Sequence, residues 1–383
     1  MKVVVAVDSL KGSLTSLEAG EAVKEGIRRA APDTVVEVLP LADGGEGTQE
    51  ALTKGLGGEE IRRQVTGPMG SPVEAVYGIV REKGLAILEM AAAAGITLVK
   101  REDQDPLHAT TFGVGELICD AVKEGCRDFI IGIGGSATSD GGLGMLQALG
   151  YEFLDQEGKP VTPDPEGMGR IVSIGQGKTM PELSECHFRV ACDVTNPLCG
   201  KNGAVYIFGG QKGVPEEEME QWDARMKRFA DLCEAFTGRR SQELPGAGAA
   251  GGLGFALLNF LNADLKPGAE LVLDTVRLEE HIQDCDLVIT GEGRLDAQTV
   301  MGKAPIRVAR LAKKYGLPVA AVTGAAGAGA EACNEAGIDA FFPILTSVVT
   351  LEEAMEQETA RYNMALTAEQ MMRLIRSCDR QKK

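Results

Sequence analysis

Short apolar runs alternate along this chain with segments of helical periodicity. The clearest run, residues 3–7, is continuously apolar, which is typical of a strand buried on both faces. Thr15-Ser16-Leu17-Glu18 follows with the spacing of a capping box and predicts a helix that ends near Ala30. The helix has one apolar face, formed at four-residue intervals by Ala19, Val23 and Ile27. The N-terminal pattern is therefore strand, helix, strand, with the second strand over residues 34–39.

The same alternation returns near the other end of the chain. Strands are predicted at residues 287–290, 318–323 and 340–345, with helices between them and a last helical stretch, with or without a break, over 351–380. The middle differs, because it contains a predicted hairpin at 73–80 and 85–90, further strands at 129–133 and 188–192, and long irregular loops.

These patterns predict an α/β protein of two domains. Residues 1–66 and 285–383 would form a discontinuous Rossmann- or flavodoxin-like domain with a parallel sheet, and residues 67–284 would form a second, mixed α/β domain inserted into it. We expect a site between the two domains, because ligand sites often lie at such boundaries.

Glycine and hydroxyl side chains are concentrated after the strand at 129–133. The turn Gly134-Gly135-Ser136-Ala137-Thr138-Ser139-Asp140-Gly141-Gly142 leads into a predicted helix. A tight turn alone needs one or two glycines, whereas this segment has four, together with three hydroxyl side chains. Bare backbone N–H groups and a helix N-terminus favour anions, so the segment is predicted to hold phosphates.

Four aspartates, Asp8, Asp43, Asp193 and Asp296, stand at or just after the ends of predicted strands. One such residue is usually only a helix cap or an Asx turn. Four in one chain favour a catalytic or metal-binding cluster. We expect Asp43 and Asp296 to meet at the carboxyl edge of one sheet and Asp193 to face them from the inserted domain. The basic residues in or beside these loops are Lys11, Lys201, Lys212, Arg294 and Lys303. Lys11, between a predicted strand and a helix start, is better placed than most to meet an anion.

Composition excludes several functions. A net charge of −17 argues against nucleic acid and anionic membranes as partners. No apolar run approaches the length of a membrane span, and no signal peptide is predicted. Nine dispersed cysteines fit reduced thiols in the cytoplasm, and three scattered histidines argue against a zinc site.

Two familiar patterns stand in the wrong context. Gly177-Lys178-Thr179 imitates the end of a P-loop, but Val172 stands where the first glycine is required. Gly246-Ala247-Gly248-Ala249-Ala250-Gly251 matches G-x-G-x-x-G, but Glu243-Leu244-Pro245 precedes it and no strand does.

Together the motifs resemble the bacterial glycerate kinase family of type I. The resemblance covers nearly the whole chain, in order, and is carried by Asp8-Ser9-Leu10-Lys11-Gly12-Ser13-Leu14-Thr15, Leu41-Ala42-Asp43-Gly44-Gly45-Glu46-Gly47-Thr48, Gly132-Ile133 with the turn at 134–142, Ala191-Cys192-Asp193-Val194-Thr195-Asn196-Pro197-Leu198, Pro245 to Gly252, and Thr290-Gly291-Glu292-Gly293-Arg294-Leu295-Asp296. It implies an ATP-dependent D-glycerate kinase of two α/β domains that uses Mg²⁺ in the cytoplasm.

Within that resemblance the site residues receive expected roles. The phosphates of ATP would lie on Gly134, Gly135, Ser136 and Thr138. Lys11, Asp43, Asp193 and Asp296 would be catalytic, with Asp193 and Asp296 also as Mg²⁺ ligands. Asp8, Ser9 and Arg294 would bind glycerate. Which of Asp43, Asp193 and Asp296 accepts the proton stays open, as does the choice between the 2- and 3-hydroxyl, although members mostly phosphorylate the 2-hydroxyl.

The sequence also allows other interpretations. The partners expected are D-glycerate and ATP, with a homo-oligomer possible, and another small hydroxy acid is an alternative substrate. A dinucleotide-dependent oxidoreductase would rest on residues 246–251. A non-enzymatic binding protein would leave four strand-end aspartates and a phosphate-type loop without a role.

Overall fold

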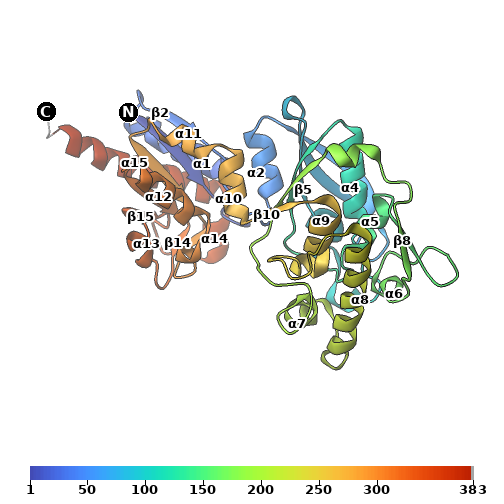
Figure 1. The fold of residues 1–383 in the computed structure, drawn as a ribbon. Helices are drawn as coiled ribbons and strands as arrows, with labels where there is room; N and C mark the ends of the chain where they lie inside the picture. The colour runs from blue at the N-terminus through green and yellow to red at the C-terminus, as the bar shows by residue number, and fades with distance from the viewer. Residues whose placement is uncertain (381–383) are drawn as a thin grey trace. The chain divides into compact units, whose positions relative to one another are not determined.

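The computed structural model describes residues 1–380 (Figure 1), and the chain consists of two compact units. The terminal unit comprises Met1–Asp43, Lys54–Leu56 and Ala269–Lys383, and the inserted unit comprises Gly44–Thr53 and Gly57–Gly268. Both contain parallel strands with helices, so the predicted α/β class is confirmed. No helix among the described residues is long and apolar enough to cross a membrane.

The terminal unit contains a five-stranded, entirely parallel sheet. Its strands are β1 (Lys2–Val7), β2 (Val35–Val38), β11 (Leu287–Gly291), β13 (Val319–Thr323) and β15 (Ala340–Pro343), in the spatial order β15-β13-β11-β1-β2. When these five strands are numbered along the chain, their spatial order is the flavodoxin-like 2-1-3-4-5. The direction of winding reverses between β1 and β11. Ligands in such folds bind beyond the carboxyl ends of the strands at that reversal.

Helices cover both faces of this sheet. On one face α1 (Ser16–Ala30) and α15 (Gln357–Arg380) share a core with alternate residues of β1, and α12 (Ala304–Lys314) packs against β11 and β13. The capping box at Thr15 and Glu18 opens α1 as predicted. The C-terminal stretch does break, into α14 (Leu351–Met355) and α15. The remaining elements are the short strands β12 (Arg294–Leu295) and β14 (Ala325–Ala326) and the helices α10 (Gly268–Thr275), α11 (Leu278–Ile282) and α13 (Ala332–Glu335).

The inserted unit contains a six-stranded mixed sheet. Its strands are β3 (Glu59–Thr66), β4 (Pro72–Val80), β5 (Leu85–Glu89), β6 (Asp128–Gly132), β9 (His187–Ala191) and β10 (Asp264–Lys266). Their spatial order, β10-β9-β6-β5-β4-β3, is the order along the chain read backwards. The predicted hairpin is β4–β5, and β5, β6, β9 and β10 are parallel. The main helices are α4 (Phe112–Lys123), α5 (Leu143–Ala148), α8 (Met219–Thr237) and α9 (Leu253–Leu261). The minor elements are α3 (Ala91–Ala94), α6 (Pro165–Met168), α7 (Ala204–Phe208), β7 (Glu152–Leu154) and β8 (Ser173–Gly175), and α2 (Thr48–Gly55) spans the first crossing between the units.

The division falls at other residues than the sequence predicted. The prediction placed residues 1–66 in the terminal domain, whereas β3 pairs with β4 along its whole length in the sheet of the inserted unit. The chain re-enters the terminal unit at Ala269 rather than at residue 285, because α10 belongs to the terminal unit. The sequence did not predict β3 because it is an edge strand of mostly polar residues, so its sequence has no apolar pattern.

Candidate active site

Asp8 occupies the point of the terminal sheet where the winding reverses. It follows β1 directly, and its backbone N–H donates to the Gly291 carbonyl at 2.8 Å, so the β1–β11 pairing continues to the sheet edge. Its side chain is buried, and one oxygen accepts a hydrogen bond from the Ser9 N–H at 2.6 Å. Burial raises the pKa of Asp8 to about 7, with further contributions from the carboxylates of Asp43 and Glu292.

Glu292 emerges beside Asp8, one residue after β11. Its carboxylate accepts a hydrogen bond from the Thr299 hydroxyl at 2.7 Å and forms an ion pair with the Lys303 ammonium at 3.4 Å. Burial raises the pKa of Glu292 above its usual value, although Thr299 and Lys303 oppose the shift. Asp8 and Glu292 therefore place two carboxyl groups of elevated pKa at the reversal point, which is typical of functional sites.

The other predicted residues of the terminal unit lie around this pair. Lys11 forms an exposed ion pair with Asp43 at 3.9 Å, and both act electrostatically on Asp8. Arg294 is exposed and lies 3.7 Å from Asp296, whose charge acts on Glu292. Asp43 and Asp296 thus belong to one group of charges along this sheet edge. Among residues 1–380, no three His, Cys, Asp or Glu side chains gather in a group that could hold a metal ion.

The predicted phosphate loop of the inserted unit leaves β6 at its carboxyl end. Gly134 and Gly135 are exposed, nothing lies within 4 Å of a Cβ built on Gly134, and Gly135 has a φ of +73°. Within the described part of the chain, no acceptor is found for the N–H groups of these two glycines. The hydroxyls of Thr138 and Ser139 are buried and likewise have no hydrogen-bond partner there. Unpaired donors of this kind suit an anionic ligand.

Asp140 fixes the second half of the loop. Its fully buried carboxylate accepts hydrogen bonds from the N–H and hydroxyl of Thr111, at 2.9 and 2.7 Å, and from the N–H groups of Gly142 and Gly144, both at 3.1 Å. These donors lie at the starts of α4 and α5. Asp140 therefore has a structural role in holding the loop to two helices.

Lys212 reaches the loop from a separate segment. The lysine ends a short 3-10 turn, Gly210–Lys212, and its buried ammonium donates to the Ser136 hydroxyl and to the Thr138 carbonyl, both at 2.6 Å. Desolvation by burial lowers the pKa of Lys212 to about 7.

Asp193 lies at the carboxyl end of β9, as predicted, and belongs to the inserted unit. Its carboxylate accepts a hydrogen bond from the Gly268 N–H at 3.0 Å. Glu89, the last residue of β5 in the same sheet, accepts from the Gln49 N–H at 2.8 Å near the start of α2. Burial raises the pKa of Glu89 above its usual value.

The glycine pattern at residues 246–251 packs against the phosphate loop. The Gly141 N–H donates to the Gly251 carbonyl at 3.0 Å, and a Cβ on Gly251 would lie 2.0 Å from the Thr138 carbonyl oxygen. The last residues of the pattern lie in a 3-10 turn, Ala249–Gly252. They do not form the turn of a strand–turn–helix unit. The glycines therefore serve close packing, and this context does not support the dinucleotide interpretation.

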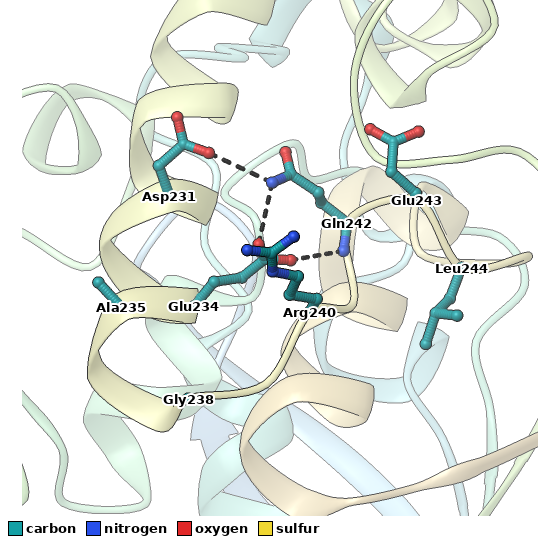
Figure 2. Close-up of a pocket in the computed structure, with 8 residues that line it drawn as sticks. All are labelled: Asp231, Glu234, Ala235, Gly238, Arg240, Gln242, Glu243 and Leu244. Atoms are coloured by element: carbon teal, nitrogen blue, oxygen red, sulfur yellow. Dashed lines mark hydrogen bonds between the residues drawn. The ribbon is translucent and has the colours of Figure 1, made fainter.

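The segment that leads into this pattern is anchored at a surface groove of about 490 Å³. Figure 2 shows the side-chain amide of Gln242 between Asp231 and Glu234, at 3.2 and 3.0 Å, while the Gln242 backbone N–H donates to Glu234 at 2.9 Å. None of the predicted site residues lines the groove.

Sequence reasoning did not select Glu292, Asp140 or Lys212 as site residues. Glu292 and Asp140 stand inside motifs that were recognised, so their position after a buried strand was an available signal. Lys212 has no such signal, because a lysine near a glycine is ordinarily exposed, and only the fold shows that its side chain is buried.

The loop offers unpaired backbone and hydroxyl donors, and the strand ends carry carboxyl groups whose pKa is raised by burial, that of Asp8 to about 7. Together these features are typical of a phosphoryl-transfer enzyme. Comparison with known proteins agrees. Residues 3–376 match the Glycerate kinase family. The chain is 47% identical over 354 residues to glycerate 2-kinase of Escherichia coli strain K12, covering 92% of this chain and 93% of the relative. It is 44% identical to glycerate kinase of Halalkalibacterium halodurans, covering 96% and 98%.

A solved structure gives the same result for the fold. The crystal structure of a Salmonella typhimurium LT2 protein matches with a TM-score of 0.92 and 43% identity over 99% of both chains. The chain belongs to the glycerate kinase family, as its motifs predicted.

Proposed function

We propose that this chain transfers the γ-phosphoryl group of ATP to the 2-hydroxyl of D-glycerate, giving 2-phosphoglycerate and ADP. The observation that carries the choice of substrate and hydroxyl is the 47% identity to a glycerate 2-kinase over nearly the full length of both chains. The geometry supports the reaction type, because phosphoryl transfer depends on positioning and charge stabilisation more than on covalent chemistry.

The ATP phosphates are assigned to the loop of the inserted unit. The N–H groups of Gly134 and Gly135 and the hydroxyls of Ser136 and Thr138 would donate to phosphate oxygens. Support comes from the unpaired glycine N–H groups and from the buried, unpartnered Thr138 hydroxyl. A ligand with many acceptor oxygens satisfies such donors.

Glycerate is assigned to the terminal unit. The basic side chains of Lys11 and Arg294 suit its carboxylate, and the Ser9 hydroxyl is available for a further hydrogen bond. Lys11 and Arg294 are both largely exposed, at 63% and 65% of their side-chain areas, so an anion can reach them.

Asp8 is the carboxylate best suited to accept the proton of the reacting hydroxyl. The hydroxyl oxygen attacks the γ-phosphorus, its proton passes to the Asp8 carboxylate, and the bond to ADP breaks. A pKa of about 7 keeps Asp8 partly ionised at neutral pH and makes it a stronger base than an ordinary aspartate. Asp43 contributes through its charge, which helps to raise that pKa.

Mg²⁺ is assigned to Asp193 and Asp296. Mg²⁺ is commonly held by one or two carboxylates together with substrate phosphates, so the oxygen donors of these two strand-end residues fit the ion. When bound, Mg²⁺ would neutralise negative charge on the phosphates. A cytoplasmic location is proposed as well, on the basis that all nine cysteines are free thiols.

The test is an ADP-release assay with D-glycerate, L-glycerate and other small hydroxy acids, followed by ³¹P NMR of the product. We expect turnover with D-glycerate and the phosphorus–proton coupling of a phosphate on the secondary carbon. A product phosphorylated only on the primary carbon would show the 3-hydroxyl to be the acceptor. Turnover with another hydroxy acid but not with glycerate would refute the substrate assignment.

A further inference from the structure

Lys212 makes an interaction that surface lysines do not make. Its side chain is 3% exposed and its two hydrogen bonds, at 2.6 Å, go to neutral oxygens of Ser136 and Thr138. No ion pair with Lys212 is present among the described residues. Desolvation and the charge of Asp140 are the two influences found on this ammonium, and they act in opposite directions.

Burying a lysine in this way is costly. An ammonium without a carboxylate in contact loses its hydration and recovers only part of that free energy through two hydrogen bonds to neutral groups. A methionine of similar length would fill the same volume without that cost. Stability alone therefore does not explain a lysine at this position.

The two acceptors of Lys212 show what the side chain does. Ser136 and Thr138 flank Ala137 at the centre of the phosphate loop, and the hydrogen bonds tie both ends of this tripeptide to the segment at 210–212. Beside them lie the unpartnered hydroxyls of Thr138 and Ser139. Asp140 holds the C-terminal half of the loop, so Lys212 is the corresponding anchor for the centre.

We propose that Lys212 is a positioning residue for nucleotide binding, which holds the loop at Ser136 and Thr138 in the conformation that receives the phosphates of ATP. This inference rests on the proposed function. It extends that function, because Lys212 acts through the loop and needs no contact with the substrate. An anionic ligand on the loop also favours the charged form of the buried ammonium.

The test compares Lys212→Met with Lys178→Met. Both changes remove one positive charge from the inserted unit, but Lys178 is exposed and belongs to the rejected P-loop-like pattern. Nucleotide affinity is measured directly by calorimetry with Mg-ATP in the absence of glycerate. Hydrogen exchange of the 134–142 segment, the melting temperature and both KM values complete the set.

In Lys212→Met we expect the Kd for Mg-ATP to rise at least about tenfold, the scale of a lost charge-assisted hydrogen bond. Exchange should become faster in residues 134–142 and stay unchanged in β3 and β4. The KM for glycerate should stay within about twofold of the wild-type value. Lys178→Met should behave as wild type in every measurement. Lys212→Arg, which restores charge and donors, should recover part of the affinity.

Wild-type nucleotide affinity in Lys212→Met would overturn the inference. A lower melting temperature with faster exchange throughout the inserted unit and unchanged Kd would show a purely structural role, as would failure of both Lys212 variants to fold. Because the affinity is measured without glycerate, a wild-type protein that binds ATP but does not phosphorylate glycerate would refute the proposed function and leave the role of Lys212 standing.

Discussion

Replacement of Asp8 by asparagine tests the proposed base with little change in shape. The carboxyl group has a pKa of about 7 in the folded protein, against 3.8 for the ordinary side chain. It is therefore protonated more readily in the native state than in the unfolded chain. Its contribution favours the native state at low pH and is lost as pH rises from about 4 to about 7. The difference in pKa corresponds to at most about 4 kcal/mol across this window.

Two measurements follow from that value. The wild-type kcat/KM should rise with pH and level off above about 7, whereas Asp8→Asn should be at least about 10²-fold slower and lack this acid limb. Hydrogen exchange in β1 and β11 reports the free energy of opening of the terminal unit. In the wild type this opening free energy should fall as pH rises. In Asp8→Asn the native state should lose much less stability over the same range.

A variant with wild-type kcat/KM would show that Asp8 does not accept the proton. An acid limb that persists unchanged in Asp8→Asn would assign the observed titration to another group, with Glu292 the first to examine because its pKa is also raised by burial. An exchange profile with the same pH dependence in both proteins would refute the elevated pKa itself.

Two further substitutions test one unit each, Lys11→Ala the terminal unit and Gly251→Ala the inserted unit. Lys11→Ala should lower kcat/KM by about 10²-fold, as expected for loss of a preorganised charge, with little change in melting temperature because the side chain is exposed; a fully active variant would make Lys11 an ordinary surface residue. Gly251→Ala should destabilise the inserted unit and raise the KM for ATP, because the new Cβ would lie 2.0 Å from the Thr138 carbonyl oxygen and the φ of +65° suits glycine; a variant with wild-type stability and KM would mean that the two loops separate at little cost.

The sequence predicted those features that depend on local chemistry. The capping box at Thr15 opens α1, and the residues predicted to share one face, Ala19, Val23 and Ile27, are all buried. The glycine-rich turn at 134–142 does lie after a buried strand. In each case the pattern and its structural consequence lie within a few residues of each other, so neighbouring positions contain the whole signal.

Features that depend on distant segments were not predictable in this way. The burial of Lys212 depends on Ser136 and Thr138, more than seventy positions away. The elevated pKa of Asp8 comes first from burial, and one of its further contributions comes from Glu292, at the other end of the chain. β3 was missed because its exposed, polar positions carry no periodic apolar signal. Asp193 follows β9 by two residues and Asp43 follows β2 by five, and their contacts with Gly268 and Lys11 came only from the structure.

The discontinuity of the terminal unit affects how the chain is made. β1 is an internal strand, and its partner β11 leaves the ribosome only after the entire inserted unit, since Val3 pairs with Leu287. At ordinary synthesis rates this delay is on the order of tens of seconds. During it, the valines of β1 have a partner on one edge only, in β2, and the α15 part of their core does not yet exist. The inserted unit, complete by Gly268, has time to fold first. Nascent chains should therefore depend on chaperones chiefly through their first forty residues, and substitutions that slow β1–β11 pairing should reduce the yield of folded protein more than its final stability.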